Sequence, residues 1–274
     1  MSNTGLSNNK HGKLFKYTTI AVCLLSFLAI GLVLYCIQIY KNDITEGALL
    51  SEIEKNDGLV YYGRYPQSEI VSVEMIDACS KAKFDKTDCS IVNGKKIKRF
   101  SVDGVYKYYQ YEPLQWQVIS SEGNSIFLIT DKIIDCELYH NTEESVDWND
   151  SDINSWLNST FINDSFTNEE KENIIKSDYG YVWLLSYDEL NSLLYKKNSF
   201  ESKDVITYST DYARSKGFKD NGKTGDGWWY LRNDNKNDYT MRTGSLSGIS
   251  VMGAIGNGFN EGTGIRPVII LKIR

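Results

Sequence analysis

The pattern of apolar and polar positions divides this chain into an N-terminal part and a globular part. Residues 17–40 form a run of 24 positions without a charged side chain, whereas after residue 58 short apolar stretches alternate with polar ones. Strand-like alternation lies at both ends of the second part, and helical periodicity lies in its middle. The pattern therefore predicts an α+β domain at residues 58–274.

Two strands joined by a tight turn are predicted at Leu114–Ser120 and Ser125–Thr130, because β-prone apolar runs lie on both sides of the turn sequence EGN at 122–124. Residues 68–107 are polar and rich in Lys, so we expect them to form an excursion from the core. Further short strands are predicted at 228–232 (WWYLR), 238–242 (DYTMR), 249–255 (ISVMGAI) and 264–273 (GIRPVIILKI).

Helix starts are marked by capping signals in the middle of the chain. Thr167 with Glu170, and Ser186 with Glu189, form the S/T-x-x-E capping box, in which the hydroxyl and the carboxylate satisfy free backbone amides. Residues 210–218 (TDYARSKGF) predict a two-turn helix that ends at a glycine. These signals fix where helices begin.

Residues 146–161, VDWNDSDINSWLNSTF, allow two interpretations. The tripeptide at 148–150 has the letters that supply calcium ligands in sugar-binding lectins, but apolar residues follow it at helical spacing. A helix start explains the letters better, with Asn149 or Ser151 capping the free amides and Trp148 packing as a hydrophobic staple. We therefore predict a helix start and no metal site in this stretch.

The uncharged run at 17–40 is long enough to cross a lipid bilayer and predicts a transmembrane helix. Lys10, Lys13 and Lys16 precede it, so the positive-inside rule predicts a cytosolic tail at 1–16 and places the rest outside the cell. Residues 41–57 are charged and are expected to form a stalk. The alternative is a cleaved secretory signal, which the length of the run and the lack of an A-x-A-like site disfavour. The sequence thus indicates a single-pass protein of the cell membrane with an extracellular C-terminal domain.

The formal charge narrows the class of partner. The whole chain carries −6, and residues 1–40 hold three Lys and no Asp or Glu, so the remainder carries −9. Nucleic acids and anionic lipids need clustered Lys and Arg on the protein, which disfavours both as partners of the outer domain. Neutral glycans, proteins and cations remain compatible with its charge.

The cysteines add one structural prediction. Cys79 and Cys89 bracket a nine-residue polar loop, and in an oxidising exterior they can close as a disulfide. Two free thiols are the equal alternative. Cys136 is expected to be a core thiol, because neither His of the chain is placed to activate it.

Short sequence blocks are spread in order over the outer domain: GRYPQ (63–67), YEPLQWQVIS (111–120), DKIIDC (131–136), WNDSDINSWLN (148–158), LLSYDEL (184–190), TDYA (210–213), WWYLR (228–232) and GIRPVIIL (264–271). Together they resemble a family of uncharacterised bacterial domains. The last two blocks also look like the C-type-lectin-like fold in its formylglycine-generating-enzyme variant. That resemblance implies a twisted antiparallel core with helices packed around it. The enzymes of that variant depend on C-terminal cysteines, and this chain has none after Cys136.

The segment 225–264 mixes Tyr, Trp, Asn, Ser, Gly and Arg as adaptable recognition surfaces do, so we predict a non-catalytic site for a glycan or a protein ligand. No catalytic residue, metal or cofactor is predicted. At least one of Trp228 and Trp229 must point into the core, since neighbours in a strand face opposite ways. Arg232 and Arg266 are also candidates for buried ion partners. The candidate ligand-binding residues are Tyr230, Arg232, Asn233, Asp234, Asn235, Tyr239 and Arg242.

Two other function classes stay open. An envelope hydrolase would use two carboxylates that face each other across a cleft. A structural or sensory domain of an envelope complex would show a flat apolar patch in place of a pocket.

Overall fold

The structure is a computed structural model that describes residues 59–142, 146–195, 202–220, 222, 225–232, 239–243, 252–255 and 262–273. The predicted tail, transmembrane helix and stalk, residues 1–57, lie outside the described residues. Among the helices that the structure describes, none combines the length and the apolar composition needed to cross a lipid bilayer.

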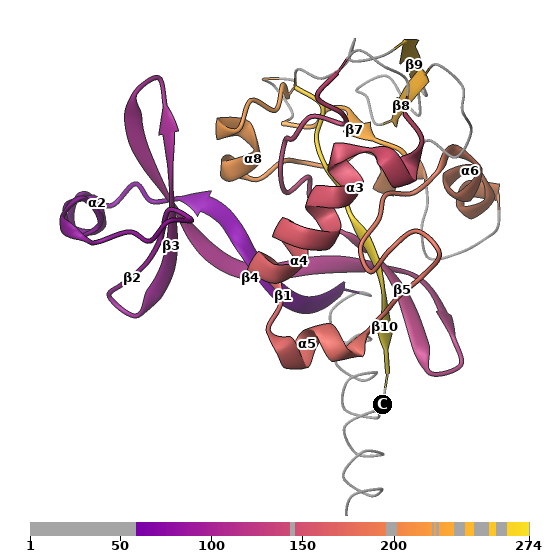
Figure 1. Ribbon diagram of the computed structural model, residues 1–274, viewed down its shortest axis with the longest axis horizontal. Coiled ribbons are helices and arrows are strands. Elements are labelled where there is room, and N and C mark those ends of the chain that lie inside the picture. The colour runs from indigo at the N-terminus through magenta and orange to yellow at the C-terminus, as the bar shows by residue number, and fades with distance from the viewer. Residues whose placement is uncertain are drawn as a thin grey trace, which may run out of the picture. The chain divides into compact units, whose positions relative to one another are not determined.

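The described residues are organised around an antiparallel sheet of seven strands (Figure 1). Its strands follow the order β2-β3-β4-β5-β10-β6, and β1 pairs with β4 beside this path. The predicted hairpin is confirmed, because β4 and β5 pair as antiparallel neighbours through the turn at 123–124. The strands are β1 (Leu59–Glu69), β2 (Cys89–Val92), β3 (Lys95–Val102), β4 (Val105–Glu122), β5 (Ser125–Thr130), β6 (Ile174–Ile175) and β10 (Val268–Lys272).

Strand β4 is the centre of the sheet, since β3, β1 and β5 pair along successive parts of it. The register between β1 and β4 shifts between Tyr61 and Arg64. Gly63 lies in this irregularity with φ +70°, and a Cβ atom there would come within 2.5 Å of the ring of Phe166. Glycine at this position therefore allows both the left-handed backbone and the close packing of Phe166.

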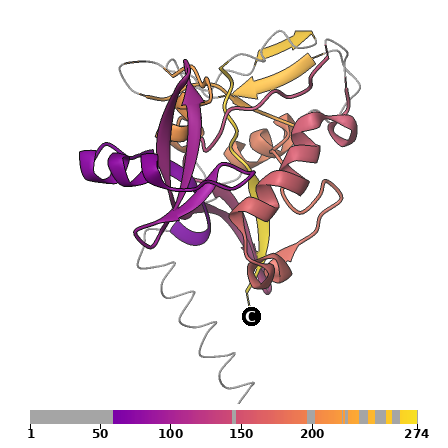
Figure 2. The same cartoon turned by 60° about the vertical axis from the view of Figure 1, so that its left-hand side comes forward.

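Short helices pack on the sheet (Figure 2). Phe161 lies with its ring centroid 5.1 Å from that of Tyr65 on β1, and Phe166 stacks 6.3 Å from Trp116 on β4. The apolar stripe predicted at 153–161 therefore faces the sheet. The helices of the second half are α3 (Asp152–Trp156), α4 (Ile162–Ser165), α5 (Asn168–Asn173), α6 (Tyr187–Tyr195), α7 (Ser202–Val205) and α8 (Asp211–Ser215).

The helix starts match the capping signals. Both capping boxes are formed: Glu170 N donates to Thr167 Oγ1, and Glu189 N donates to Ser186 Oγ. Ser151 caps α3, so the helix-start interpretation of 146–161 is confirmed. Residues 148–150 form a separate 3-10 turn, η1 (Trp148–Asp150), and so the alternative cap at Asn149 is wrong.

The predicted α+β, C-type-lectin-like fold is wrong for the described residues. They are mostly antiparallel sheet, and the longest helices among them, α2 (Val73–Lys81) and α6, have nine residues each. The helix predicted from 146 onward is interrupted by a π turn, η2 (Leu157–Phe161). Asn158 Nδ2 donates to the carbonyl of Asn154 there, in competition with the backbone ladder. Caps mark where a helix begins but do not set its length.

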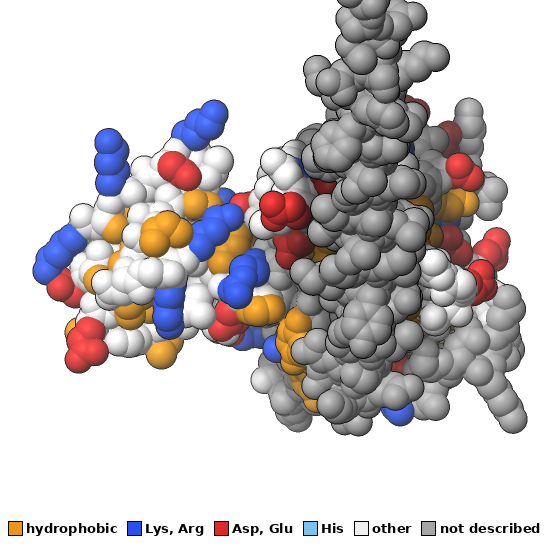
Figure 3. Space-filling model, turned by 90° about the horizontal axis from the view of Figure 1, so that it is seen from below, with side chains coloured by type: hydrophobic (Ala, Val, Ile, Leu, Met, Phe, Trp, Pro, Cys, Tyr) orange, Lys and Arg blue, Asp and Glu red, His pale blue; other side chains and the backbone are white. Residues whose placement is uncertain are grey.

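The excursion at 68–107 is an ordered lobe made of α2, β2 and β3 (Figure 2). Lys and Arg side chains stand around it (Figure 3). The predicted Cys79–Cys89 disulfide is not formed, and both thiols are free and buried. Cys79 packs in an apolar cluster with Val92 and Ile97, whereas Cys89 Sγ lies 3.3 Å from Tyr111 Oη. The two thiols thus lie in different packing environments.

A second, three-stranded antiparallel sheet consists of β7 (Trp229–Tyr230), β8 (Tyr239–Thr243) and β9 (Met252–Ile255). Trp229 is completely buried and Trp228 is half-buried, which confirms that one of the pair points into the core. Arg266 is buried as well, and it donates to the carbonyl of Thr130 and to Gln117 Oε1. The GIRP block therefore ties the end of the chain to β4 and β5.

Candidate functional site

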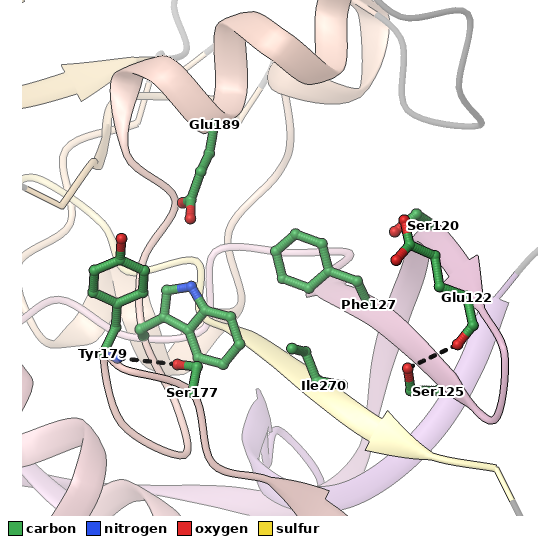
Figure 4. A pocket seen from close by; sticks show the side chains of 9 residues that line it. Ser120, Glu122, Ser125, Phe127, Ser177, Tyr179, Glu189 and Ile270 are labelled. Atoms are coloured by element: carbon green, nitrogen blue, oxygen red, sulfur yellow. Dashed lines mark hydrogen bonds between the residues drawn. The ribbon is translucent and has the colours of Figure 1, made fainter.

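A pocket of about 350 Å³ lies where the sheet meets the loop at 177–183 and the start of α6 (Figure 4). Its floor is a row of residues on three neighbouring strands, because the sheet register places Phe127 of β5 between Ser120 of β4 and Ile270 of β10. The residues around the pocket are Ser120, Glu122, Ser125, Phe127, Ser177, Tyr179, Trp183, Glu189 and Ile270.

Aromatic side chains give the pocket its apolar surface. Phe127 and Trp183 are stacked, with ring centroids 5.7 Å apart and planes inclined by 12°. Trp183 is held by two backbone hydrogen bonds to Val268 on β10, and it is 3% exposed. Its indole Nε1 is buried and has no hydrogen-bond partner among the described residues. A buried donor without an acceptor is costly, so this N–H is a point at which a ligand can add a hydrogen bond.

Glu189 supplies the charged wall of the pocket and is fixed from two sides. Its Oε2 accepts from Ser186 N at 2.8 Å as part of the capping box of α6, and its Oε1 lies 3.2 Å from Arg232 Nη2. Arg232 is 1% exposed, and its guanidinium lies 3.3 Å from the ring centroid of Tyr179. Arg232 of the WWYLR block thus orients two lining side chains, those of Glu189 and Tyr179.

The loop at 177–183 is anchored by the WNDSDINSWLN block. Trp148 Nε1 donates to the carbonyl of Tyr179 at 2.9 Å. Asn158 Oδ1 accepts from Tyr181 N at 2.7 Å, and Asn158 Nδ2 donates to the carbonyl of Val182 at 2.8 Å. These bonds set the backbone path of the loop and hence the position of its pocket side chains.

Both charged residues that line the pocket are carboxylates. Glu122 is exposed, and Glu189 is paired with the buried Arg232. Lys and Arg are missing from this set of lining residues. The lining therefore disfavours anionic ligands and accepts neutral or cationic ones.

The predicted ligand-binding residues are placed differently from what the sequence indicated. Tyr230 was expected to be exposed, but it is completely buried and packs against Tyr139 at 5.4 Å between centroids. Arg232 is buried beneath the pocket, and its predicted alternative role as an ion partner is confirmed by Glu189. Tyr239 and Arg242 lie on β8. Asn233, Asp234 and Asn235 lie outside the described residues.

Sequence reasoning missed the aromatic residues of the pocket. Phe127 and Trp183 each lie in a short apolar run, which is as typical of a core strand as of a binding site. Glu189 was recognised as the partner in a capping box but not as a lining residue. The one signal in the sequence is that Glu189 follows closely after the aromatic and apolar run at 181–185. The rest of the pocket gives no sequence signal, because only the sheet register brings Phe127 and Ile270 together.

A second cavity, of about 440 Å³, lies beside a buried ion cluster at Cys136, Glu137 and Lys216. Lys216 Nζ pairs with Glu137 and lies 3.6 Å from Asp135 Oδ1. Asp135 is completely buried and accepts from Tyr65 Oη at 2.5 Å and from Cys136 N at 2.6 Å. The two carboxylates share one ammonium group and do not face each other across a cleft. This arrangement favours a structural ion cluster that joins β1 to the end of α8.

Burial and neighbouring charges together set the pKa values of this cluster. Burial raises the pKa of Glu137 and raises that of the Cys136 thiol to about 12, so the thiol is not an activated nucleophile. Burial alone lowers the pKa of Lys216, but Asp135 and Glu137 more than compensate and hold it above its usual value. Cys136 is thus the core thiol that the sequence predicted.

Comparison with known proteins gives one match. Residues 123–273 match the family described as "Domain of unknown function (DUF6273)", which covers more than half of the chain and includes the pocket residues from Ser125 to Ile270. No curated protein and no solved structure matches the chain. The expected membership of an uncharacterised domain family is confirmed, whereas the blocks GRYPQ and YEPLQWQVIS precede the matched residues. The chain therefore belongs to the family of domains of unknown function DUF6273.

Proposed function

We propose that this protein is a non-catalytic ligand-binding protein and that the pocket between Phe127, Trp183 and Glu189 is its binding site. The observation that carries the proposal is the buried indole N–H of Trp183, which has no hydrogen-bond partner among the described residues while Trp183 lines an aromatic pocket. Pockets of about 300–1,000 Å³ with apolar walls and a few fixed polar groups are typical of small-ligand sites.

The ligand class is a glycan or a polar group on a surface protein. Aromatic rings can pack on sugar rings, and the hydroxyl and carboxylate oxygens of the lining can accept hydrogen bonds from ligand hydroxyls. Both oxygens of Glu189 are already engaged by Ser186 and Arg232, which suits a fixed acceptor better than a group that exchanges protons.

A hydrolase is the second candidate, because two carboxylates line this pocket from different walls. Glu122 ends β4 and Glu189 begins α6 (Figure 4). Replacement of Glu122 by Gln separates the two functions. A binding protein forms no product in either form, whereas a hydrolase of this type loses turnover in the variant.

The proposal is tested with an array of glycans, cell-wall fragments and cell-surface proteins. Phe127→Ala removes half of the stacked aromatic pair, and Tyr208→Ala is the matched control, since Tyr208 is 62% exposed and does not line the pocket. We expect a ligand whose binding is lost with Phe127→Ala and kept with Tyr208→Ala. Equal ligand binding by the two variants would mean that this pocket is not the binding site.

The proposal includes a location at the cell surface. It rests on the sequence of residues 1–40 alone, which lie outside the described residues. Protease treatment of intact cells tests it: we expect digestion of the domain at 59–273, and full protection would contradict an outer location.

A further inference from the structure

The polar groups of the pocket define what a ligand must carry. Trp183 offers an N–H donor that has no acceptor among the described residues, and Glu189 offers carboxylate oxygens fixed by Ser186 and Arg232. A ligand that satisfies both needs an acceptor and a donor within the width of one pocket. Phe127 and Ile270 are adjacent on the floor, so part of the same ligand group must be apolar.

The charges and hydrogen-bonding groups of the pocket disfavour several simple ligand groups. A carboxylate or phosphate would satisfy the indole N–H but would enter a pocket whose charged lining residues are Glu122 and Glu189. An ammonium group would pair with the carboxylates but would leave the indole donor without an acceptor. A hydroxyl group can both donate and accept, but it does so through a single oxygen atom, whereas the carbonyl and the N–H of an amide are separate groups. An uncharged secondary amide with a small acyl group meets all three conditions.

We infer that the pocket binds an uncharged N-acylated amino sugar, an inference that rests on the proposed binding function. The amide carbonyl accepts from Trp183 Nε1, the amide N–H donates to the Glu189 carboxylate, and the acyl methyl group packs on Phe127 and Ile270. The sugar ring then extends toward the more exposed side of the pocket. Ser120, Ser125 and Glu122 lie there and provide oxygens for its hydroxyl groups (Figure 4).

Three trisaccharides that differ at one position test this inference on the full chain. They are the β-1,4-linked trimers of N-acetylglucosamine, of glucosamine and of glucose. We expect the acetylated trimer to bind about tenfold or more tightly than the glucose trimer, which is the scale of one or two added hydrogen bonds with an apolar contact. An N-acetylated dipeptide amide supplies the same amide without a sugar and is expected to bind more weakly than the acetylated trimer.

Trp183→Phe is the decisive variant, because it removes the indole N–H and keeps an aromatic ring against Phe127. We expect it to lower affinity for the acetylated trimer about tenfold and to leave that for the glucose trimer nearly unchanged. If this variant does not fold, the ¹⁵N-indole resonances of the unaltered protein replace it. One indole resonance, assigned to Trp183, must then shift on adding the acetylated trimer and stay in place with the glucose trimer.

The outcomes separate this inference from the proposed function. Equal affinity for the acetylated and glucose trimers, or an unchanged preference in Trp183→Phe, overturns the amide. Tighter binding of the dipeptide amide overturns the sugar. If none of the trimers binds while another ligand is lost with Phe127→Ala, the inference fails and the proposed function stands. If Phe127→Ala leaves every ligand bound, the proposed function fails.

Discussion

At the scale of single residues, Asn158 does most to shape the pocket from outside it. Its side chain bonds to Tyr181 N, Val182 N and the Val182 carbonyl, all in the loop that positions Trp183. Asn158→Ala leaves these backbone groups without their partner, so we predict a loss of about 1–3 kcal/mol in the free energy of unfolding. Chemical denaturation measures the loss, and hydrogen exchange should increase at residues 177–183.

The matched control is Asn163→Ala. Asn163 lies in the same helical segment, but its Nδ2 donates to the carbonyl of Ser159 at an exposed position. Replacement there should change the free energy of unfolding by about 0.5 kcal/mol or less. Equal losses for the two variants would mean that Asn158 does not hold the loop.

Cys136 gives a prediction for the dependence of stability on pH. Its pKa is raised to about 12 in the folded protein, from an unfolded value near 9. Above pH 9 the unfolded chain releases this proton while the folded protein retains it, so stability falls as the pH rises toward 12. One such group contributes a slope of at most about 1.4 kcal/mol per pH unit. We predict a smaller slope between pH 9 and 10 in Cys136→Ala than in the unaltered protein.

Denaturation curves from pH 7 to pH 10.5 measure this difference. At pH 7 the thiol is protonated in both states, so the gap between the two proteins there gives the packing cost of the substitution alone. The gap should narrow as the pH rises above 9. A constant gap over this range would show that Cys136 ionises with similar ease in the folded and unfolded states.

At the scale of elements, the two capping boxes look alike in the sequence, but their carboxylates differ in the further contacts that they make. Glu170 caps α5 at an exposed site. Glu189 caps α6, pairs with buried Arg232 and lines the pocket. We predict that Glu170→Ala costs about 1 kcal/mol of stability, and that Glu189→Ala costs about 3 kcal/mol because Arg232 loses a carboxylate partner.

Thermal and chemical unfolding of both variants check the order of these losses, and ligand binding supplies a second measure. Only Glu189→Ala should weaken binding at the pocket. Glu170→Ala is the control for the loss of a helix cap as such. Similar losses of stability in the two variants would contradict the role assigned to the pair of Glu189 with Arg232.

Elements with local causes could be predicted from the sequence. The turn at 122–124, the two capping boxes and the Ser151 cap depend on residues next to each other, and all of them are present. The pocket could not be predicted, because its floor joins Ser120, Phe127 and Ile270 through the sheet register. Tyr230 lies in a segment whose composition is typical of recognition surfaces, but composition does not determine burial. Tyr230 is buried because β7 packs into the core.

At the scale of the whole described chain, the residues that match DUF6273 are not a complete structural unit. The match begins at 123, in the turn between β4 and β5, and so omits the central strand of the sheet. Trp116 of β4 stacks on Phe166, and Gln117 accepts from the buried Arg266. The first half of the sheet is therefore part of the core that supports the pocket.

Two truncations test this dependence. We predict that residues 123–273 alone show no cooperative unfolding transition, because β5 loses its partner strand β4 and the apolar face under Phe166 becomes exposed.

The matched variant removes only the lobe, by replacing residues 72–106 with a two-residue Asn-Gly turn. Ile70 N donates to the Tyr108 carbonyl, so β1 and β4 are close enough for such a hairpin connection. The lobe has its own apolar cluster, so this variant should unfold cooperatively and keep the pocket, which calorimetry and ligand binding will measure. Cooperative folding of 123–273 would show instead that the family domain is stable without β1 and β4.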